Sequence, residues 1–323
     1  MTAAPVLSVD NLSVEFRTRS GIVKALEGVN FAINRGEMVA IVGESGSGKS
    51  VTAYTVMGIL DAAGRVTQGS ATFGGLDLLN TPENILRDIR GREISMIFQN
   101  PRVALNPIRR VGDQIADVLL QHGNVTRREA PQRAIEMLMK VRIPDPQRRA
   151  KAYPFELSGG MCQRIMIAIA LACSPKLLIA DEPTTGLDVT TQAAIMDLIA
   201  ELGAEQGMAT LLITHDLGMA AEYCDHIVVM HAGHIVEAAP TVDLFRHPRH
   251  PYTAKLIAAT PKPTVSLMDL AAIPGNLPDL RATDIAPCRY SARCERRQSR
   301  CDQALPHVLG DERNSMVACW NPL

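Results

Sequence analysis

Hydrophobic runs of strand length recur along the chain and alternate with stretches that have helical spacing. Four of these runs are apolar on both faces, which is typical of strands in the centre of a parallel sheet. They are Met38–Val42, Ile94–Phe98, Leu177–Ala180 and Thr210–Ile213. Shorter runs rich in β-branched residues predict three further strands and a hairpin that turns at Ala232-Gly233. These runs are Val6–Val9, Leu12–Phe16 and Val29–Ile33, with Ile227–Met230 and His234–Glu237 as the hairpin.

The segments between the strands carry helical periodicity. Apolar residues at positions i, i+3, i+4 and i+7 predict one helix, for which Gly203 and Gly207 are stop signals. Those positions are Ile195, Leu198, Ile199 and Leu202. Residues 113–142 mix apolar and charged positions at the same spacing and predict a helical subdomain. Strands that alternate with helices favour an α/β fold with a mainly parallel sheet.

Length and charge limit the classes of protein that this chain can form. Its 323 residues are 46% hydrophobic, which is ample for the buried cores of two or three domains. A formal net charge of -1 argues against a protein whose whole surface follows nucleic acid phosphates. No apolar run approaches the roughly 18–20 residues that span a bilayer, and Met1–Asp10 lacks the pattern of a secretion signal. We therefore expect the chain to stay in the cytosol.

The composition changes after about Pro261, where prolines interrupt regular structure and cysteines accumulate. We expect a linker near residues 260–285. It separates a first domain at residues 1–260, with a helical subdomain at about 100–157, from a C-terminal extension at residues 261–323. The extension holds four of the seven cysteines, which in a reducing cytosol indicate a metal site more readily than disulfides. The other three, Cys162, Cys173 and Cys224, are expected to be buried, inert thiols.

The segment Gly43–Ser50 fits the pattern G-x-x-x-x-G-K-[ST], directly after a predicted buried strand and before a predicted helix. Its glycines let backbone N–H groups point at phosphate oxygens, and the helix adds its positive N-terminal end. Lys49 supplies a point charge for the β- and γ-phosphates, and Ser50 offers a hydroxyl to Mg²⁺. The expected nucleotide ligands are Gly43, Ser45, Gly46, Gly48, Lys49 and Ser50.

Two carboxylates follow the predicted strand Leu177–Ala180, where sites gather in open α/β sheets. Asp181 is placed to hold Mg²⁺ through water, and Glu182 to polarise an attacking water as a general base. A second glycine segment, Leu157–Gly160, precedes a long apolar helix. It forms another anion-binding helix N-terminus, in which Ser158 is an extra donor.

Together these segments resemble the ATP-binding cassette ATPases, the motor subunits of ABC transporters, over residues from about 6 to 240. Gly43–Ser50 matches their Walker A motif, Leu177–Glu182 their Walker B with its catalytic glutamate, and Leu157–Gly160 their signature loop. The resemblance implies a P-loop NTPase fold with a RecA-like parallel sheet core, an antiparallel β subdomain and a helical subdomain, here followed by a small Cys-rich C-terminal module. Met161 departs from the commonest signature, which has glutamine, at a position that does not contact phosphate.

The resemblance also implies roles for residues that the motifs alone do not assign. Ser158, Gly159 and Gly160 would reach the γ-phosphate of ATP bound by a partner subunit. Gln99 matches the Q-loop glutamine, which senses Mg²⁺ and touches the membrane subunits. Asp188 belongs to a D-loop, His215 matches the switch histidine that contacts the γ-phosphate, and Phe16 is the adenine-stacking aromatic. Mg²⁺ would then be held by Ser50, Gln99 and Asp181.

Finer details are similar to the importers of dipeptides and oligopeptides, a group that also includes importers of nickel and of glycans or opines. They are Phe98-Gln99-Asn100-Pro101, Leu105-Asn106-Pro107, Met161 and His250-Pro251-Tyr252-Thr253. The resemblance implies import driven by ATP hydrolysis. It also implies a second ABC ATPase as partner in a heterodimer, two transmembrane permease subunits and an extracytoplasmic substrate-binding protein, with no nucleic acid. The chain would be peripheral, on the cytoplasmic face of the inner membrane.

The four C-terminal cysteines are spaced C-x₅-C-x₆-C-x₁₇-C, as Cys288, Cys294, Cys301 and Cys319. No C-x₂₋₄-C knuckle of a structural zinc site occurs among them, and the longer spacing suits a cubane cluster. Six arginines against two acidic residues in 281–301 would neutralise such an anionic cluster, or form a basic surface. Many ATPases of the resembling group carry a [4Fe-4S] cluster in a C-terminal extension. Zinc and free thiols remain alternatives.

Two other classes of function compete with transport. A soluble ABC ATPase acting on DNA or the ribosome would carry long coiled coils or a zinc module between Walker A and the signature, or two cassettes in one chain. The interval from Ser50 to Ser158 has no heptad run and no cysteine, and the chain has one cassette. An iron–sulfur regulator gated by the ATPase is the other alternative. ATPase activity that is indifferent to membrane subunits would favour either.

Overall fold

The computed structural model describes residues 4–123, 125–261, 273–282, 284–306, 308–310 and 315–323. The chain forms two compact units. The terminal unit contains Met1–Ile33, Met38–Asn80 and Leu212–Leu323, and the middle unit contains Asn34–Glu37 and Thr81–Leu211. The chain passes from the middle unit into the terminal unit within strand β8 (Ala209–Thr214).

An antiparallel sheet with the order β2-β1-β4-β5 opens the terminal unit. Its strands are β1 (Leu7–Thr18), β2 (Gly21–Ile33), β4 (Gly64–Phe73) and β5 (Leu76–Asp77). The two predicted strands before residue 17 are one continuous strand, because Asp10-Asn11 forms a β-bulge instead of a break. The register with β2 shifts between Val9 and Leu12, and Asn11 has a φ of 50°, which asparagine tolerates. The antiparallel β subdomain is thereby confirmed.

The terminal unit also contains the predicted hairpin, as β9 (His226–His231) and β10 (His234–Pro240). Its turn residues have positive φ, 49° at Ala232 and 85° at Gly233, as a tight hairpin turn requires. On one side β9 pairs in parallel with β3 (Met38–Val42). The helices of this unit are α1 (Lys49–Met57), α9 (Leu217–Tyr223), α10 (Thr241–Arg246) and α11 (Pro251–Ala259).

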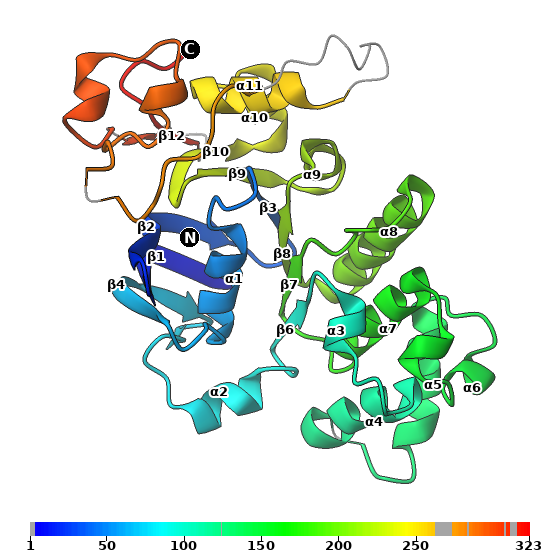
Figure 1. The fold of residues 1–323 in the computed structure, drawn as a ribbon. Coiled ribbons are helices and arrows are strands. Elements are labelled where there is room, and N and C mark those ends of the chain that lie inside the picture. The colour runs from blue at the N-terminus through cyan, green and yellow to red at the C-terminus, as the bar shows by residue number, and fades with distance from the viewer. Residues whose placement is uncertain (1–3, 124, 262–272, 283, 307, 311–314) are drawn as a thin grey trace. The chain divides into compact units, whose positions relative to one another are not determined.

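The C-terminal extension continues the same unit. Strand β12 (Met316–Ala318) pairs antiparallel with β10, and β11 (Val308–Gly310) pairs with β12, so the red end of the chain lies beside the hairpin (Figure 1). Two short 3₁₀ turns, Ser291–Arg293 and Ser299–Asp302, precede β11 in the chain. The predicted linker at 260–285 lies partly outside the described residues. The division at residue 260 stays a prediction.

The middle unit contains the parallel pair β6 (Ile94–Ile97) and β7 (Leu177–Asp181). Its helices include α4 (Val111–His122), α5 (Ala130–Lys140) and α7 (Gly159–Leu171), which pack against one another (Figure 1). The helical segment predicted at 113–142 is therefore confirmed as two helices. The others are α2 (Glu83–Ile89), α3 (Pro101–Ala104), α6 (Pro146–Arg149), α8 (Val189–Gln206) and the 3₁₀ turn Pro154–Glu156.

Helix α8 corrects one detail of the sequence analysis. Gly203 lies inside the helix, and the stop is Gly207, which adopts a left-handed φ of 60°. Every residue of β3, β6, β7 and β8 is buried, as the apolar runs predict, but Phe98, the last residue of the predicted run Ile94–Phe98, lies beyond β6 and is exposed. Over the described ranges, no helix combines the length and the hydropathy that a membrane span requires.

Candidate functional site

The phosphate-binding segment Gly43–Ser50 joins the buried strand β3 to helix α1. Its backbone runs so close to neighbouring backbone and side-chain atoms that side chains would not fit at two positions. A Cβ on Gly43 would lie 2.2 Å from the carbonyl oxygen of Met230, and one on Gly48 would lie 2.7 Å from Leu26 Cδ2. The Gly233 N–H donates to the Ser47 carbonyl at 2.7 Å, so the hairpin turn supports the loop. The strand–loop–helix context required by a Walker A motif is present.

Lys49 is buried, with 5% of its surface exposed, and its ammonium group lies inside the loop. Its Nζ donates to the carbonyl oxygens of Gly43 at 2.8 Å and Glu44 at 3.0 Å. These two bonds hold the ammonium group against the loop backbone. The role of Lys49 as the charge that faces the nucleotide stays a prediction.

Two further predicted residues lie in the same unit. Phe16 is half-buried on β1, and a Cβ on Gly64 of β4 would lie 2.8 Å from the Phe16 ring, so the ring covers that glycine. His215 is exposed directly after β8, and Asp216 caps helix α9 by accepting from the Met219 N–H at 3.1 Å. Their predicted contacts, with adenine and with the γ-phosphate, stay predictions.

In the middle unit, the structure brings together two of the three predicted catalytic side chains, Gln99 and Glu182. Gln99 Nε2 donates to Glu182 Oε2 at 2.8 Å, and the Thr185 hydroxyl donates to the same oxygen at 2.9 Å. Glu182 adopts a positive φ of 47°, which is strained for a residue with a Cβ and is common at functional sites. The preceding Asp181 is 1% exposed and ends the buried strand β7. Thr185 was not predicted, because nothing in its local sequence marks it.

The signature residues begin helix α7. Ser158 caps the helix by accepting from the Met161 N–H at 3.3 Å. Gly160 is packed closely, because a Cβ there would lie 3.2 Å from Thr191 Cγ2. Thr191 also binds Asp188, which accepts from its N–H at 3.0 Å and from its hydroxyl at 2.7 Å and so caps α8. These hydrogen bonds from Thr191 lower the pKa of Asp188. The signature loop and the D-loop are thus neighbours within the middle unit.

The four C-terminal cysteines share an environment in the terminal unit. Backbone N–H groups of Gln298 and Asn321 lie 3.5 Å and 3.4 Å from the sulfurs of Cys301 and Cys319. Burial raises the pKa of Cys288 to about 12, and a hydrogen bond from the Tyr290 backbone acts in the opposite sense. Electrostatic interactions with Cys294, Cys301 and Cys319 also raise the pKa of Cys288, so the four cysteines lie in the same part of the terminal unit.

Each of the four cysteine sulfurs has a backbone N–H donor. The donors to Cys288, Cys301 and Cys319 are given above, and the Arg296 N–H is the donor to Cys294. Backbone donors to sulfur stabilise thiolates and tune clusters. Across the described ranges, however, no group of three or more His, Cys, Asp or Glu side chains is placed to hold a metal ion. The Cys-rich module is therefore not confirmed as a metal centre.

The arginines of 281–301 meet only in part the expectation that they surround the cysteines. The charge of Arg296 acts against the effect of burial on the pKa of Cys294 and Cys319, whereas other groups bind most of the remaining arginines. Arg281 pairs with Asp279 and Arg297 with Asp302, while Arg300 lies over the Trp320 ring. Arg289 and Arg293 are buried, with side chains only 3% and 4% exposed. Neither the charge pattern nor the sequence spacing indicated those two buried positions.

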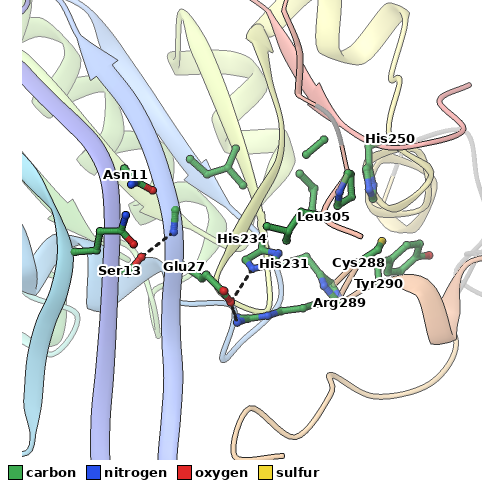
Figure 2. Close-up of a pocket in the computed structure, with 16 residues that line it drawn as sticks. Asn11, Ser13, Glu27, His231, His234, His250, Cys288, Arg289, Tyr290 and Leu305 are labelled. Atoms are coloured by element: carbon green, nitrogen blue, oxygen red, sulfur yellow. Dashed lines mark hydrogen bonds and ion pairs between the residues drawn. The ribbon is translucent and has the colours of Figure 1, made fainter. Parts of the chain in front are cut away.

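A cavity of about 290 Å³ lies beside Arg289 in the terminal unit (Figure 2). Arg289 donates to the Ala232 carbonyl and pairs with Glu27, whose Oε2 also lies 3.3 Å from His234 Nε2. The hydrogen bond with His234, assisted by the charge of Arg289, lowers the pKa of Glu27 to about 2. This ion pair joins the C-terminal extension to strand β2 and the hairpin turn.

Comparison with known proteins agrees with both the cassette motifs and the features typical of dipeptide and oligopeptide importers. The ABC transporter family matches residues 26–185, and the C-terminal region of oligopeptide/dipeptide transporters matches residues 236–301. The oligopeptide transport ATP-binding protein OppD of Escherichia coli is 47% identical over 321 residues, covering 99% of this chain and 94% of that protein. The dipeptide transport ATP-binding protein DppD of Bacillus subtilis is 45% identical over 316 residues, covering 98% and 94%.

Solved structures agree with the fold. The dimeric structure of MJ0796, a bacterial ABC transporter cassette, has a TM-score of 0.66 at 29% identity and covers 73% of this chain and 98% of that chain. CbiO1 from Clostridium perfringens, part of the ABC transporter complex cbiONQ, has a TM-score of 0.64 at 29% identity and covers 76% and 92%. The chain therefore belongs to the family of ABC transporter ATP-binding subunits of the oligopeptide/dipeptide importers.

Proposed function

We propose that this protein hydrolyses ATP as the motor subunit of an importer of dipeptides or oligopeptides. The observation that carries the ATPase part is the placement of Glu182, bound by Gln99 and Thr185 at the end of a buried strand. The substrate class rests on the relatives, which are named as oligopeptide and dipeptide transport proteins. Nickel, glycans and opines are the alternative substrates.

The residues of this chain divide the work of hydrolysis. Gly43–Ser50 binds the phosphates, with Lys49 as the charge and the start of α1 as the dipole. Mg²⁺ supplies charge neutralisation at the phosphates, and Ser50, Gln99 and Asp181 would hold it. Glu182 accepts the proton of the attacking water, and His215 orients the γ-phosphate. Phe16 stacks on adenine.

The proposed assembly pairs this chain with a second ABC ATPase. Ser158, Gly159, Gly160 and Asp188 complete the site of that partner, and the partner's signature loop completes this one. A solved cassette that resembles this chain is dimeric, which supports the arrangement. Two permease subunits would receive the motion through the Gln99 region, and an extracytoplasmic binding protein would deliver the peptide. In this assembly the chain would be located peripherally at the cytoplasmic face of the inner membrane.

A binding screen on the substrate-binding protein of this importer tests the substrate class. Peptides of two to five residues, nickel chelates and glycans are titrated separately, and heat release is measured. We expect saturable heat release with peptides only. A flat response to peptides together with saturable binding of nickel chelates or glycans would refute the peptide proposal.

We further propose that Cys288, Cys294, Cys301 and Cys319 bind a [4Fe-4S] cluster that stabilises the C-terminal extension. The shared environment of the four sulfurs and the backbone donor at each of them support this ligand set. The cluster would supply cross-links to an extension whose described residues after 273 form only two short 3₁₀ turns and two three-residue strands. Zinc bound by the same thiolates, or free thiols, are the alternatives.

Anaerobic purification of the full chain tests the cluster. We expect brown protein with broad absorption near about 400 nm and about four iron atoms per chain. Cys301→Ser should lose the colour and most of the iron, whereas Cys173→Ser, outside the C-terminal extension, should retain both. Colourless protein that contains zinc or no metal contradicts the cluster.

A further inference from the structure

Glu44, the second residue of the phosphate-binding segment, is held at three points. Its backbone N–H donates to the Tyr252 hydroxyl at 3.1 Å, and its carbonyl accepts from Lys49 Nζ at 3.0 Å. Its carboxylate binds both terminal nitrogens of Arg293, at 2.7 Å and 2.9 Å. A fork of two charge-assisted hydrogen bonds fixes geometry as well as charge. Residues far outside the Walker A motif thus define the path of its first half.

Arg293 belongs to the C-terminal extension and directly precedes Cys294. Its side chain is 4% exposed, and two more of its donors are used: Nε donates to the Pro274 carbonyl at 2.8 Å, and Nη1 lies 3.2 Å from His231 Nε2. Burial lowers the pKa of His231 to about 3, so this ring is neutral at pH 7 and can accept from the guanidinium.

A second contact from the extension reaches the same loop. The position of a Cβ on Gly46 would lie 3.5 Å from Leu277 Cδ1. Leu277 and Arg293 are both distant from the loop in sequence. They nevertheless approach Gly46 and Glu44, two loop residues that are only two positions apart. The extension therefore packs on the phosphate-binding segment itself, beyond its pairing with the hairpin.

The charge of Glu44 matters because the loop receives a polyanion. A carboxylate beside incoming phosphates opposes their binding unless a cation neutralises it. Burial acts to raise the pKa of Glu44, but the hydrogen bonds and the charge of Arg293 outweigh it and keep the pKa below its usual value. The carboxylate is thus ionised at pH 7 and paired with Arg293 of the extension.

We propose that Arg293 is a positioning residue of the nucleotide site, which neutralises Glu44 and so makes the affinity of the Walker A loop for nucleotide dependent on the C-terminal extension. The inference rests on ATP binding at this loop and not on the presence of a cluster at the cysteines. The effect of Arg293 passes through the Glu44 side chain.

A double-mutant cycle on the full chain tests this proposal, with ADP titrated by calorimetry and steady-state hydrolysis of ATP as the second readout. Arg293→Ala should weaken ADP binding at least about fivefold, the lower end of usual coupling between linked sites, and should raise KM more than it lowers kcat. Glu44→Gln alone removes the carboxylate and gives the reference affinity of a loop that carries no charge at this position. The double variant should recover to nearly the Glu44→Gln value, because the unpaired carboxylate is then absent.

Arg297→Ala is the matched control. Arg297 lies in the same extension, four residues on, but is 53% exposed and pairs with Asp302, so nucleotide binding should be unchanged. Thermal unfolding monitors the fold of each variant, and Arg293→Lys, which keeps the charge without the fork, should lie between Arg293→Ala and the wild type. Unchanged ADP affinity in a folded Arg293→Ala, or a double variant as weak as Arg293→Ala, would overturn the proposal.

Discussion

Glu182→Gln is expected to lower ATP hydrolysis by about 10²–10⁴-fold and to leave nucleotide binding intact, because the amide cannot take the proton of the attacking water. The change preserves the size of the side chain at the end of β7, where the backbone φ of 47° fixes its direction. Gln99 and Thr185 both donate to the carboxylate oxygen. That oxygen is thus the acceptor around which this part of the site is arranged.

Hydrolysis is measured as phosphate release by the full chain, and binding by titration with ADP. Glu201→Gln serves as the control, since Glu201 lies on α8, is 54% exposed and pairs with Arg142. It should hydrolyse ATP at the wild-type rate. Undiminished hydrolysis by Glu182→Gln would remove Glu182 as the general base.

Lys49→Ala is expected to weaken nucleotide binding by about 10- to 100-fold, as the loss of a hydrogen-bonded charge worth about 1.5–3 kcal/mol implies. Two effects add in the same direction. The phosphates lose their point charge, and the carbonyls of Gly43 and Glu44 lose the donor that shapes the loop. Unlike Glu182→Gln, which should lower the hydrolysis rate and leave binding intact, Lys49→Ala should therefore lower the affinity for nucleotide itself.

Titration of each variant with ADP separates the two cases. Lys140→Ala, at the exposed end of α5, is the control and should bind as the wild type does. If Lys49→Ala bound ADP with unchanged affinity, the phosphate-binding role of this loop would be wrong.

The buried strands and the motif positions could be predicted because their signals are local. A run such as Met38–Val42 is apolar at every residue, and it is buried at every residue in the structure. The hairpin turn is equally local, since Ala232-Gly233 permits the positive φ that two-residue turns need. The prediction of a strand end at Asp10-Asn11 was wrong because a β-bulge and a strand end carry the same residue types.

The role of the C-terminal extension could not be predicted, because its contacts join residues far apart in the chain. Arg293 and Glu44 are separated by 249 positions, and no spacing rule links them. The count of arginines suggested neutralisation of a cluster, whereas the buried arginines pair with Glu27 and Glu44 of the cassette. Tyr252 was noted only as part of a family resemblance, and its hydroxyl contact with the Glu44 N–H gives it a physical function.

The central claim, that this chain is an ATP-hydrolysing motor coupled to peptide import, is tested most directly in proteoliposomes. The complete importer is reconstituted with its binding protein, and uptake of a labelled peptide is measured with phosphate release. With wild-type chain, peptide-loaded binding protein should stimulate both together, and Glu182→Gln in this chain should abolish uptake while ATP still binds. Peptide uptake that persists with Glu182→Gln, or ATP hydrolysis that ignores the permease subunits and the loaded binding protein, would contradict the account.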